Sequence, residues 1–240
     1  MSVGTVIAGA ALALGLVGAA WVGGQALIAA QAPVRAVTVK GLAERPVEAD
    51  IAAWRLAFRG EGAEQAAAIA DAARQRDAVR AFALAGGLSP DEIAEEPFTL
   101  KVDRVFYDNG QSERLRFSAV GALRIRTPRV DAVAALSGRT LELLAQGVRL
   151  GEGDYAEAPR PLYVFTGLNA VKPAMIADAT RSARAAADQF AADSGARVGA
   201  ILSANQGVVQ VLARDGDYPE RLERWKLVRV VSTVEYALEK

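Results

Sequence analysis

The chain has 240 residues, with 28 Lys+Arg and 28 Asp+Glu, so its formal net charge is zero; it contains no histidine and no cysteine. Balanced charge argues against a general nucleic-acid binder. The missing residue types exclude disulfides, thiolate catalysis, Cys-ligated metals, and mechanisms built on a Ser-His-Asp triad or a histidine–metal centre. Composition alone therefore names no reaction, although 52% of the residues are hydrophobic.

The first charged side chain is Arg35, and residues 3–30 form a mostly apolar run rich in alanine and glycine. About 20 apolar residues cross a bilayer core. We therefore predict an uncleaved N-terminal transmembrane helix, with the membrane anchor over residues 1–32 and a domain over residues 33–240. One alternative is a signal peptide cleaved after Ala30 or Ala32, although its start carries no Lys or Arg. The other is a buried core helix.

The orientation of this anchor is open from charge alone. Arg35, Lys40 and Arg45 follow it, and the positive-inside rule then places the domain in the cytoplasm, but long domains translocate largely regardless of charge. Small residues also recur at every fourth position, which is typical of paired membrane helices but also arises easily from this composition. They are Ala11, Gly15, Ala19 and Gly23.

The first half of the domain alternates extended and helical patterns. The predicted elements are strands over 34–41 and 47–59 separated by a turn at 44–46, a helix over 63–85 ended by Gly86-Gly87, a helical turn after Ser89, and a hairpin of 96–107 and 113–127 around 108–110. The predicted core residues are Trp54, Leu56 and Phe58 in the second strand, Ile69, Ala73, Val79, Phe82 and Ala83 in the helix, and Leu115, Phe117, Ala119, Leu123 and Ile125 in the hairpin.

The second half repeats this alternation. A helix over 128–147 precedes strand-like segments at 148–150 and 162–166, which flank an irregular acidic stretch over 151–160. A long Ala-rich helix follows over 169–192, with Pro173 expected in its first turn and Ser194-Gly195 at its end. Strands over 198–212 and 224–238, joined at 215–217, complete the chain. The fold class is α+β, with antiparallel sheets and helices packed on one face.

Two segments resemble each other at a constant offset of 107 residues. The hexapeptide 69–74 (IADAAR) matches 176–181 (IADATR), Glu113-Arg114-Leu115 matches 220–222, and Asp108 corresponds to Asp215. A shared offset across helix and hairpin predicts an internal repeat of helix-strand-strand units over 63–127 and 169–238. The alternative is two amphipathic helices followed by two hairpins that are similar only in pattern.

The segment 151–157 groups three carboxylates among glycines, as some calcium loops do, but fits no EF-hand spacing, so a solvated loop is favoured. Five arginines could line the wet face of the first hairpin and meet phosphate or acidic lipid, although a solvated sheet face is the simpler reading. They are Arg104, Arg114, Arg116, Arg124 and Arg126. Tyr163, Phe165, Trp225 and Tyr236 fit core or subunit contacts better than a ligand box. We assign no catalytic, cofactor-binding or metal-binding residue and no cofactor.

The order of these elements resembles the SIMPL-domain family of bacterial envelope proteins over about residues 36–240. The matching features are Val37-Thr38-Val39-Lys40-Gly41, Pro46-x-x-Ala49-Asp50-Ile51, the Ala-rich helix closed by Gly-Gly, the helix 174–195 followed by 197–201, and the closing strand 230–238. The resemblance implies an exported or membrane-anchored domain in the periplasm. Family members are linked to oxidative stress defence, and some form ring-like oligomers, but no catalytic residues carry over.

We therefore expect a non-enzymatic, self-associating domain of the cell envelope, attached to the inner membrane by a single span and facing the periplasm. Its expected partners are further copies of itself and the membrane, not nucleic acid. It contributes, in this reading, to envelope or oxidative stress tolerance. The alternative is a periplasmic domain that binds lipid or a small ligand in an apolar cleft lined by Trp54, Phe58 or Phe165. An enzyme that uses Glu, Lys or Tyr is the third possibility.

Overall fold

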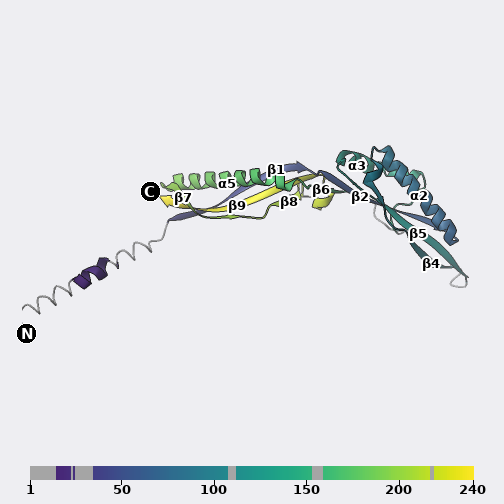
Figure 1. The fold of residues 1–240 in the computed structure, drawn as a ribbon, viewed down its shortest axis with the longest axis horizontal. Helices are drawn as coiled ribbons and strands as arrows, with labels where there is room; N and C mark the ends of the chain where they lie inside the picture. Colours follow the sequence, from purple (N-terminus) through teal and green to yellow (C-terminus); the bar gives the residue numbers. More distant parts are fainter. Residues whose placement is uncertain (1–14, 23, 25–34, 108–111, 153–158, 217–218) are drawn as a thin grey trace, which may run out of the picture. The chain divides into compact units, whose positions relative to one another are not determined.

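The computed structural model describes residues 15–22, 24, 35–107, 112–152, 159–216 and 219–240 (Figure 1). The chain divides into two compact units. The larger unit comprises Leu42–Thr180 and Gln206–Val231, and the smaller unit comprises Met1–Gly41, Arg181–Asn205 and Ser232–Lys240. Four elements, described below as β1, α5, β7 and β9, contribute residues to both units.

A five-stranded antiparallel sheet forms the centre of the larger unit. Its strands are β2 (Ile51–Gly62), β3 (Ile93–Glu95), β4 (Thr99–Tyr107), β5 (Ser112–Thr127) and β6 (Leu162–Val164). The order is β3-β5-β2-β6, and β4 also pairs with β5. The predicted hairpin is therefore confirmed in β4 and β5, while its predicted turn at 108–110 lies outside the described residues.

The register between β2 and β5 decides which side chains form the core. Trp54 lies opposite Ile125 and Leu56 opposite Leu123, so these four side chains share one face and are buried. Helices cover this face: α2 (Gln65–Ala85), α3 (Val130–Ser137) and α4 (Leu141–Ala145) all contribute to the same apolar cluster. The predicted core side of the second strand is confirmed.

Helix α2 ends where the sequence predicts. Gly86 caps it, and Gly87 takes a φ of 89°, a conformation that side-chain-bearing residues rarely adopt. The chain then enters η1 (Pro90–Glu92), the helical turn predicted after Ser89, and a capping box joins Ser89 and Glu92. The apolar stripe of α2 is only partly as predicted, because Ile69 is exposed while Ala68, Ala72 and Gln75 are buried.

A second antiparallel sheet has the order β1-β9-β7, with β8 also paired to β9. Its strands are β1 (Ala36–Glu48), β7 (Arg197–Gln206), β8 (Gln210–Ala213) and β9 (Trp225–Glu239), and η3 (Glu220–Leu222) precedes β9. The predicted turn at Glu44–Pro46 is wrong, because β1 runs straight through it. A proline is compatible with this strand because β1 lies at the edge of its sheet.

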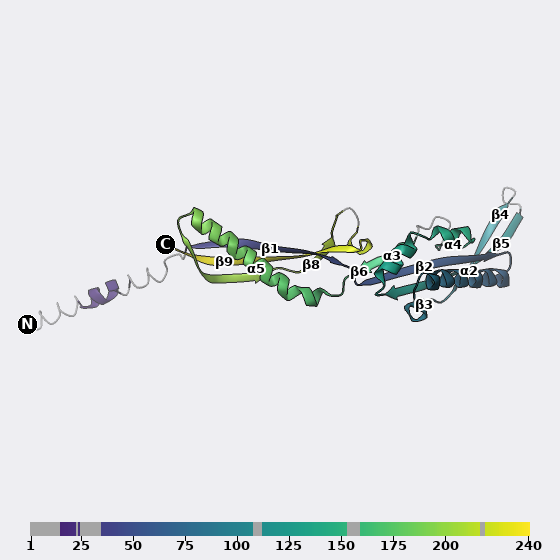
Figure 2. The same cartoon turned by 90° about the horizontal axis from the view of Figure 1, so that it is seen from above.

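The helix α5 (Leu168–Asp193) packs on this sheet through small side chains (Figure 2). In the smaller unit, Ala183 and Ala187 join Val234 and Tyr236 of β9. In the larger unit, Met175 and Ala179 join Val228 and Val230. The buried residues of α5 recur at every fourth position, which lets the helix approach the strands closely. They are Met175, Ala179, Ala183, Ala187 and Ala191.

Three further boundaries differ from the prediction. The helix predicted over 128–147 is divided into α3 and α4 by a turn at residues 138–140, where Gly138 caps α3. The strand predicted over 198–212 is divided by residues 207–209 into β7 and β8, and both parts pair with β9. Pro173 lies inside α5, in its second turn, whereas the prediction places it in the first turn.

The predicted anchor falls mostly outside the described residues. Within it, residues 15–22 and 24 are helical and exposed. None of the helices in the described ranges combines the length and the apolar character that a membrane span requires.

The two copies of the predicted repeat agree in their helices. Residues 69–74 lie in α2 and residues 176–181 lie in α5, and the corresponding Ala72 and Ala179 are both buried. The match at 113–115 and 220–222 does not extend to local structure, because the first lies in β5 and the second forms η3. Duplication of the unit therefore stays a prediction.

Candidate functional site

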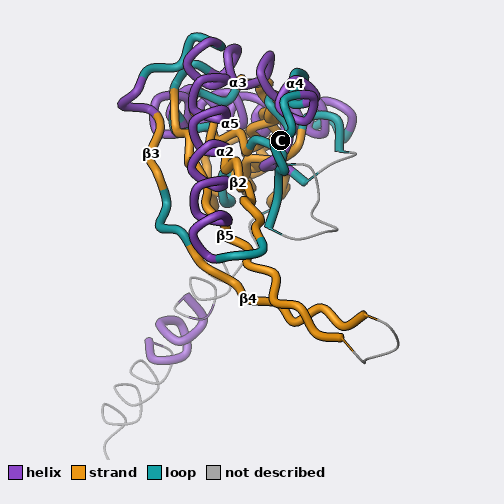
Figure 3. Tube along the Cα trace, turned by 90° about the vertical axis from the view of Figure 1, so that its right-hand side faces the viewer, coloured by secondary structure: helices purple, strands orange, loops and turns teal. Residues whose placement is uncertain are grey.

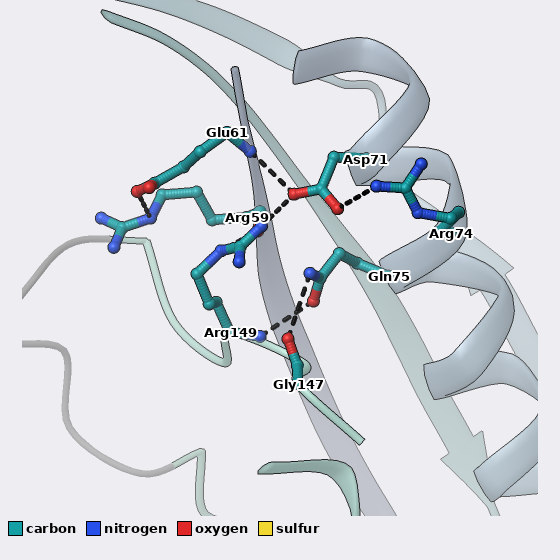
Figure 4. A network of polar contacts seen from close by, with 7 residues as sticks. All are labelled: Arg59, Glu61, Asp71, Arg74, Gln75, Gly147 and Arg149. Carbon is teal, nitrogen blue, oxygen red and sulfur yellow. Dashed lines mark hydrogen bonds and ion pairs between the residues drawn. The ribbon is translucent and has the colours of Figure 1, made fainter. Parts of the chain in front are cut away.

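A polar network around Asp71 holds α2 in place (Figure 4). Its carboxylate accepts hydrogen bonds from the Glu61 N–H at 2.9 Å and from Arg74 at 2.8 Å, and it pairs with Arg149. The Asp71 side chain is only 14% exposed. It thus joins α2 to the end of β2 and to the segment that follows α4.

Gln75, one turn further along α2, extends this network. Its buried amide donates to the Gly147 carbonyl at 3.3 Å and accepts from the Arg149 N–H at 2.8 Å. The Arg149 carbonyl in turn accepts from the Arg59 N–H of β2 at 3.0 Å. The segment 147–149 is therefore bound between helix and sheet, and the network serves as a structural brace.

The environment of Asp71 predicts a loss of stability in acid. Burial alone would raise the pKa of the Asp71 carboxyl, but the Glu61 N–H and the guanidinium groups of Arg149 and Arg74 outweigh it and lower that pKa. A depressed folded-state pKa stabilises the fold above the unfolded-state pKa, and this contribution is lost as pH falls through the folded-state value.

We expect Asp71→Asn to lower the free energy of unfolding by about 1–3 kcal/mol at pH 7, because charged hydrogen bonds are lost. The difference from the wild type should shrink as pH falls, which urea denaturation at a series of pH values measures. Asp188→Asn is the matched control, since Asp188 pairs with Arg184 on an exposed helix face and should change stability by less than about 0.5 kcal/mol. A difference for Asp71→Asn that does not depend on pH would contradict this account.

An apolar groove lies on the opposite flank of α2. It has a volume of about 330 Å³ and runs between α2 and the start of β4. Apolar side chains dominate its lining, and Arg76 lies at its margin, where its guanidinium is engaged by Asp77 and Glu95. The lining residues are Gln65, Ile69, Ala73, Arg76, Phe98, Thr99, Leu100 and Ala119.

Beyond the groove, the β4–β5 hairpin extends past the end of β2. The last pair between β2 and β5 is Gly62 with Phe117, and beyond it β4 and β5 continue as a two-stranded ribbon (Figure 3). Val102 and Leu115 of this ribbon are about half exposed. The prediction that Leu115 is a core residue is therefore wrong, and Ile69 of α2 contributes to the groove instead of the core.

The five arginines of the hairpin do not form one face. Arg104 lies opposite Leu115 in the β4–β5 register, whereas Arg116 lies opposite Asp103 and Arg124 opposite Arg55. Since neighbours across a ladder share a face, Arg104 is on the other side of the sheet from Arg114, Arg116, Arg124 and Arg126. The prediction of a single arginine face is correct for four of the five.

The acidic stretch after Leu150 is only partly described. Glu152 binds Arg55 at 2.6 Å, and Glu96 binds the same guanidinium at 2.8 Å. Asp154 and Glu157 lie outside the described residues. In the described part of the chain, no three acidic side chains come together in a way that could hold a metal ion.

The predicted aromatic residues occupy different places. Tyr236 is buried beneath the Arg184 guanidinium, at 5.2 Å from the ring centre, and Phe165 is partly buried in the α5 cluster. Trp225 is partly exposed and lies beneath Arg214. Trp54 and Phe58 belong to the closed core, so they do not line a cleft as the lipid-binding alternative expects.

Tyr163 borders a separate open cavity of about 390 Å³ with Ser137 and Arg160. Burial raises the pKa of the Tyr163 hydroxyl, and this outweighs its hydrogen bond with Ser137 and the nearby charge of Arg224. A tyrosine that acts as a general base near neutral pH needs a lowered pKa. The environment of Tyr163 therefore does not activate it.

The edge strand β7 exposes two large apolar side chains. Ile201 is 54% and Leu202 47% exposed, and the two point to opposite faces of the sheet. Residues 198–206 contain no charged side chain. The sequence predicts this segment only as a strand, although its lack of charge is visible there.

The two α+β units thus contain a structural brace around Asp71, an apolar groove beside α2 and an open edge at β7. The groove and the open edge are surfaces suited to binding. The SIMPL family model, described as a protein of unknown function (DUF541), matches residues 37–226. The match covers well over half of the chain, so this chain belongs to the SIMPL family, and the predicted resemblance is confirmed. No curated protein matches the sequence.

Proposed function

We propose that this chain is a non-enzymatic SIMPL-domain protein of the bacterial envelope that acts by self-association. The observation that carries the proposal is β7, an edge strand that exposes apolar side chains on both faces and has no charge after Arg197. Natural edge strands are usually protected by charges, proline or a covering element, since an open edge pairs with other chains. The absence of histidine and cysteine and the unactivated Tyr163 support a binding role.

The proposal includes attachment to the inner membrane through residues 3–30, with the domain in the periplasm. The uncharged apolar run supports the anchor, and the family resemblance supports the location and a role in envelope or oxidative stress tolerance. Full-length protein should stay in the membrane pellet after an alkaline wash and retain its N-terminal residues in mass spectrometry. A mature N-terminus directly after Ala30 or Ala32 would contradict the anchor.

Self-association is tested on the full chain in detergent by light scattering, with the detergent mass subtracted. We expect an oligomer in the wild type and a shift toward monomer in Leu202→Lys, because a lysine on an edge strand opposes pairing. Leu141→Lys is the matched control, since Leu141 is 73% exposed but lies in α4, away from β7. A wild-type protein that stays monomeric over a wide concentration range would refute the proposal.

A second candidate function is the binding of a lipid chain or small apolar ligand in the groove beside α2. The groove is the specific observation in its favour, and it replaces the cleft expected near Trp54 and Phe58. Ligand at about 100 times its Kd stabilises a protein by about 2.7 kcal/mol, which raises the Tm by roughly 5–10 °C for a domain of this size.

The test is a thermal shift with fatty acids and phospholipids at a series of concentrations. Ile69→Glu should abolish the shift without unfolding the protein, because Ile69 is already exposed. Leu141→Glu is the control, since Leu141 is an exposed apolar residue of α4 outside the groove. An unchanged Tm across the whole panel would refute this second function.

A further inference from the structure

Three long strand edges lack a neighbouring strand within the described residues, and they differ in protection. The edge of β1 carries Lys40, Glu44, Arg45 and Glu48 together with Pro46. The edge strand β4 carries Lys101, Asp103 and Arg104. Only β7 has its charge confined to one end, at Arg197. Of the three, β7 is thus the edge best suited to accept another strand.

Contacts at the start of β7 further define the open part of this edge. Arg184 of α5 donates to the Val198 carbonyl at 3.3 Å, and Arg197 donates to the Lys240 carbonyl at 3.0 Å. Arg184 also donates to the Gly199 carbonyl at 3.5 Å, so these contacts occupy the first three residues of the strand. From residue 200 to residue 206 every side chain is exposed, so the available segment has the length of an ordinary strand.

We infer that β7 pairs antiparallel with β7 of a second copy across a twofold axis near Leu202. This inference rests on the proposed self-association and names its interface. A second copy fits this edge because the strand is complementary to itself: the uncharged run 198–206 has Leu202 at its centre. In an antiparallel pair centred there, Arg197 lies opposite residue 207 of the partner, so like charges stay apart.

The same arrangement covers the exposed apolar side chains. Leu202 of one copy lies beside Leu202 of the other on one face, and on the opposite face Ile201 lies diagonally across from its counterpart near the same axis. The isologous contact closes on itself, since the same strand serves both copies. It joins the two β1-β9-β7 sheets into one continuous sheet in which β7 is no longer an edge strand.

The absence of cysteine makes a disulfide test clean, because a single introduced cysteine is the only thiol in the chain. Opposed Cα atoms in an antiparallel pair lie about 4.5–5.5 Å apart, within the range that a disulfide bridges. We expect Leu202→Cys to form a disulfide dimer under mild oxidation of the full chain in detergent. Ala200→Cys and Ala204→Cys should each fail alone but crosslink when the two variants are mixed, because residue 200 faces residue 204 of the partner.

Val208→Cys, exposed outside the strand, is the control for random collision. Crosslinking of all three strand variants alone, as parallel pairing in register would give, would overturn the inference. An oligomer in light scattering with no crosslink above the Val208→Cys control would overturn it too while leaving self-association intact. A monomer in light scattering would contradict both the β7 pairing and the proposed self-association.

Discussion

Phe58→Ala is expected to lower the free energy of unfolding by about 3–5 kcal/mol, the usual cost of deleting a large buried side chain. Phe58 is fully buried in the main cluster, where it pairs edge-on with Phe98 at 5.9 Å between ring centres. Its replacement leaves a cavity beneath the groove-lining Phe98. Chemical denaturation followed by tryptophan fluorescence, to which buried Trp54 of the same cluster contributes, measures this loss.

Phe190→Ala provides the matched control for this experiment. Phe190 lies on the exposed side of α5, so the same change of side chain should alter stability by less than about 1 kcal/mol. Equal effects of the two substitutions would contradict the assignment of Phe58 to the core.

Gly60→Ala is expected to destabilise the protein by about 3 kcal/mol, the upper end of the usual cost of overpacking. A methyl group at Gly60 would lie 2.1 Å from the Ala72 nitrogen and 2.6 Å from the Ala68 carbonyl oxygen. These are backbone atoms of α2, so no side-chain rotation relieves the collision and the helix must move away from β2. Urea denaturation gives the free energy, and circular dichroism reports whether the helix persists.

Gly138→Ala is the control, because a Cβ there meets no atom closer than 3.6 Å and the residue has ordinary helical dihedrals. It should leave stability unchanged or raise it by less than about 1 kcal/mol. A small effect at Gly60 would show that α2 does not approach β2 as closely as described.

Strong periodic patterns and end signals made much of this fold predictable. The alternation around Trp54, the Gly86-Gly87 stop of α2 and the helical turn after Ser89 each combine a local preference with a matching tertiary role. Glu44–Pro46 misled the prediction because a proline and two charges signal a turn, whereas at a sheet edge all three are compatible with a strand. The edge position of β1 is a tertiary fact that the local sequence does not contain.

The candidate surfaces were harder to predict because they depend on where elements stop relative to one another. Ile69 fits an apolar stripe, yet it is exposed because α2 turns a row of alanines toward β2 and β5 and leaves Ile69 on its flank. Leu115 alternates like a core residue, but β2 ends opposite Phe117 and leaves Leu115 on the ribbon. Arg104 could be placed correctly only with the register of β4 against β5.

The brace beside α2 also affects how the backbone exchanges hydrogen with solvent. Residues 147–151 belong to no strand beyond a single bridge at Leu150, yet the N–H of Val148 bonds to Leu143, that of Arg149 to Gln75, and that of Gly151 to Ala57. Slow amide exchange follows hydrogen bonding rather than strand assignment. We therefore expect the N–H groups of Arg149 and Gly151 to exchange slowly, together with those of α2 and β2, as part of the cooperative unit of unfolding that contains the sheet.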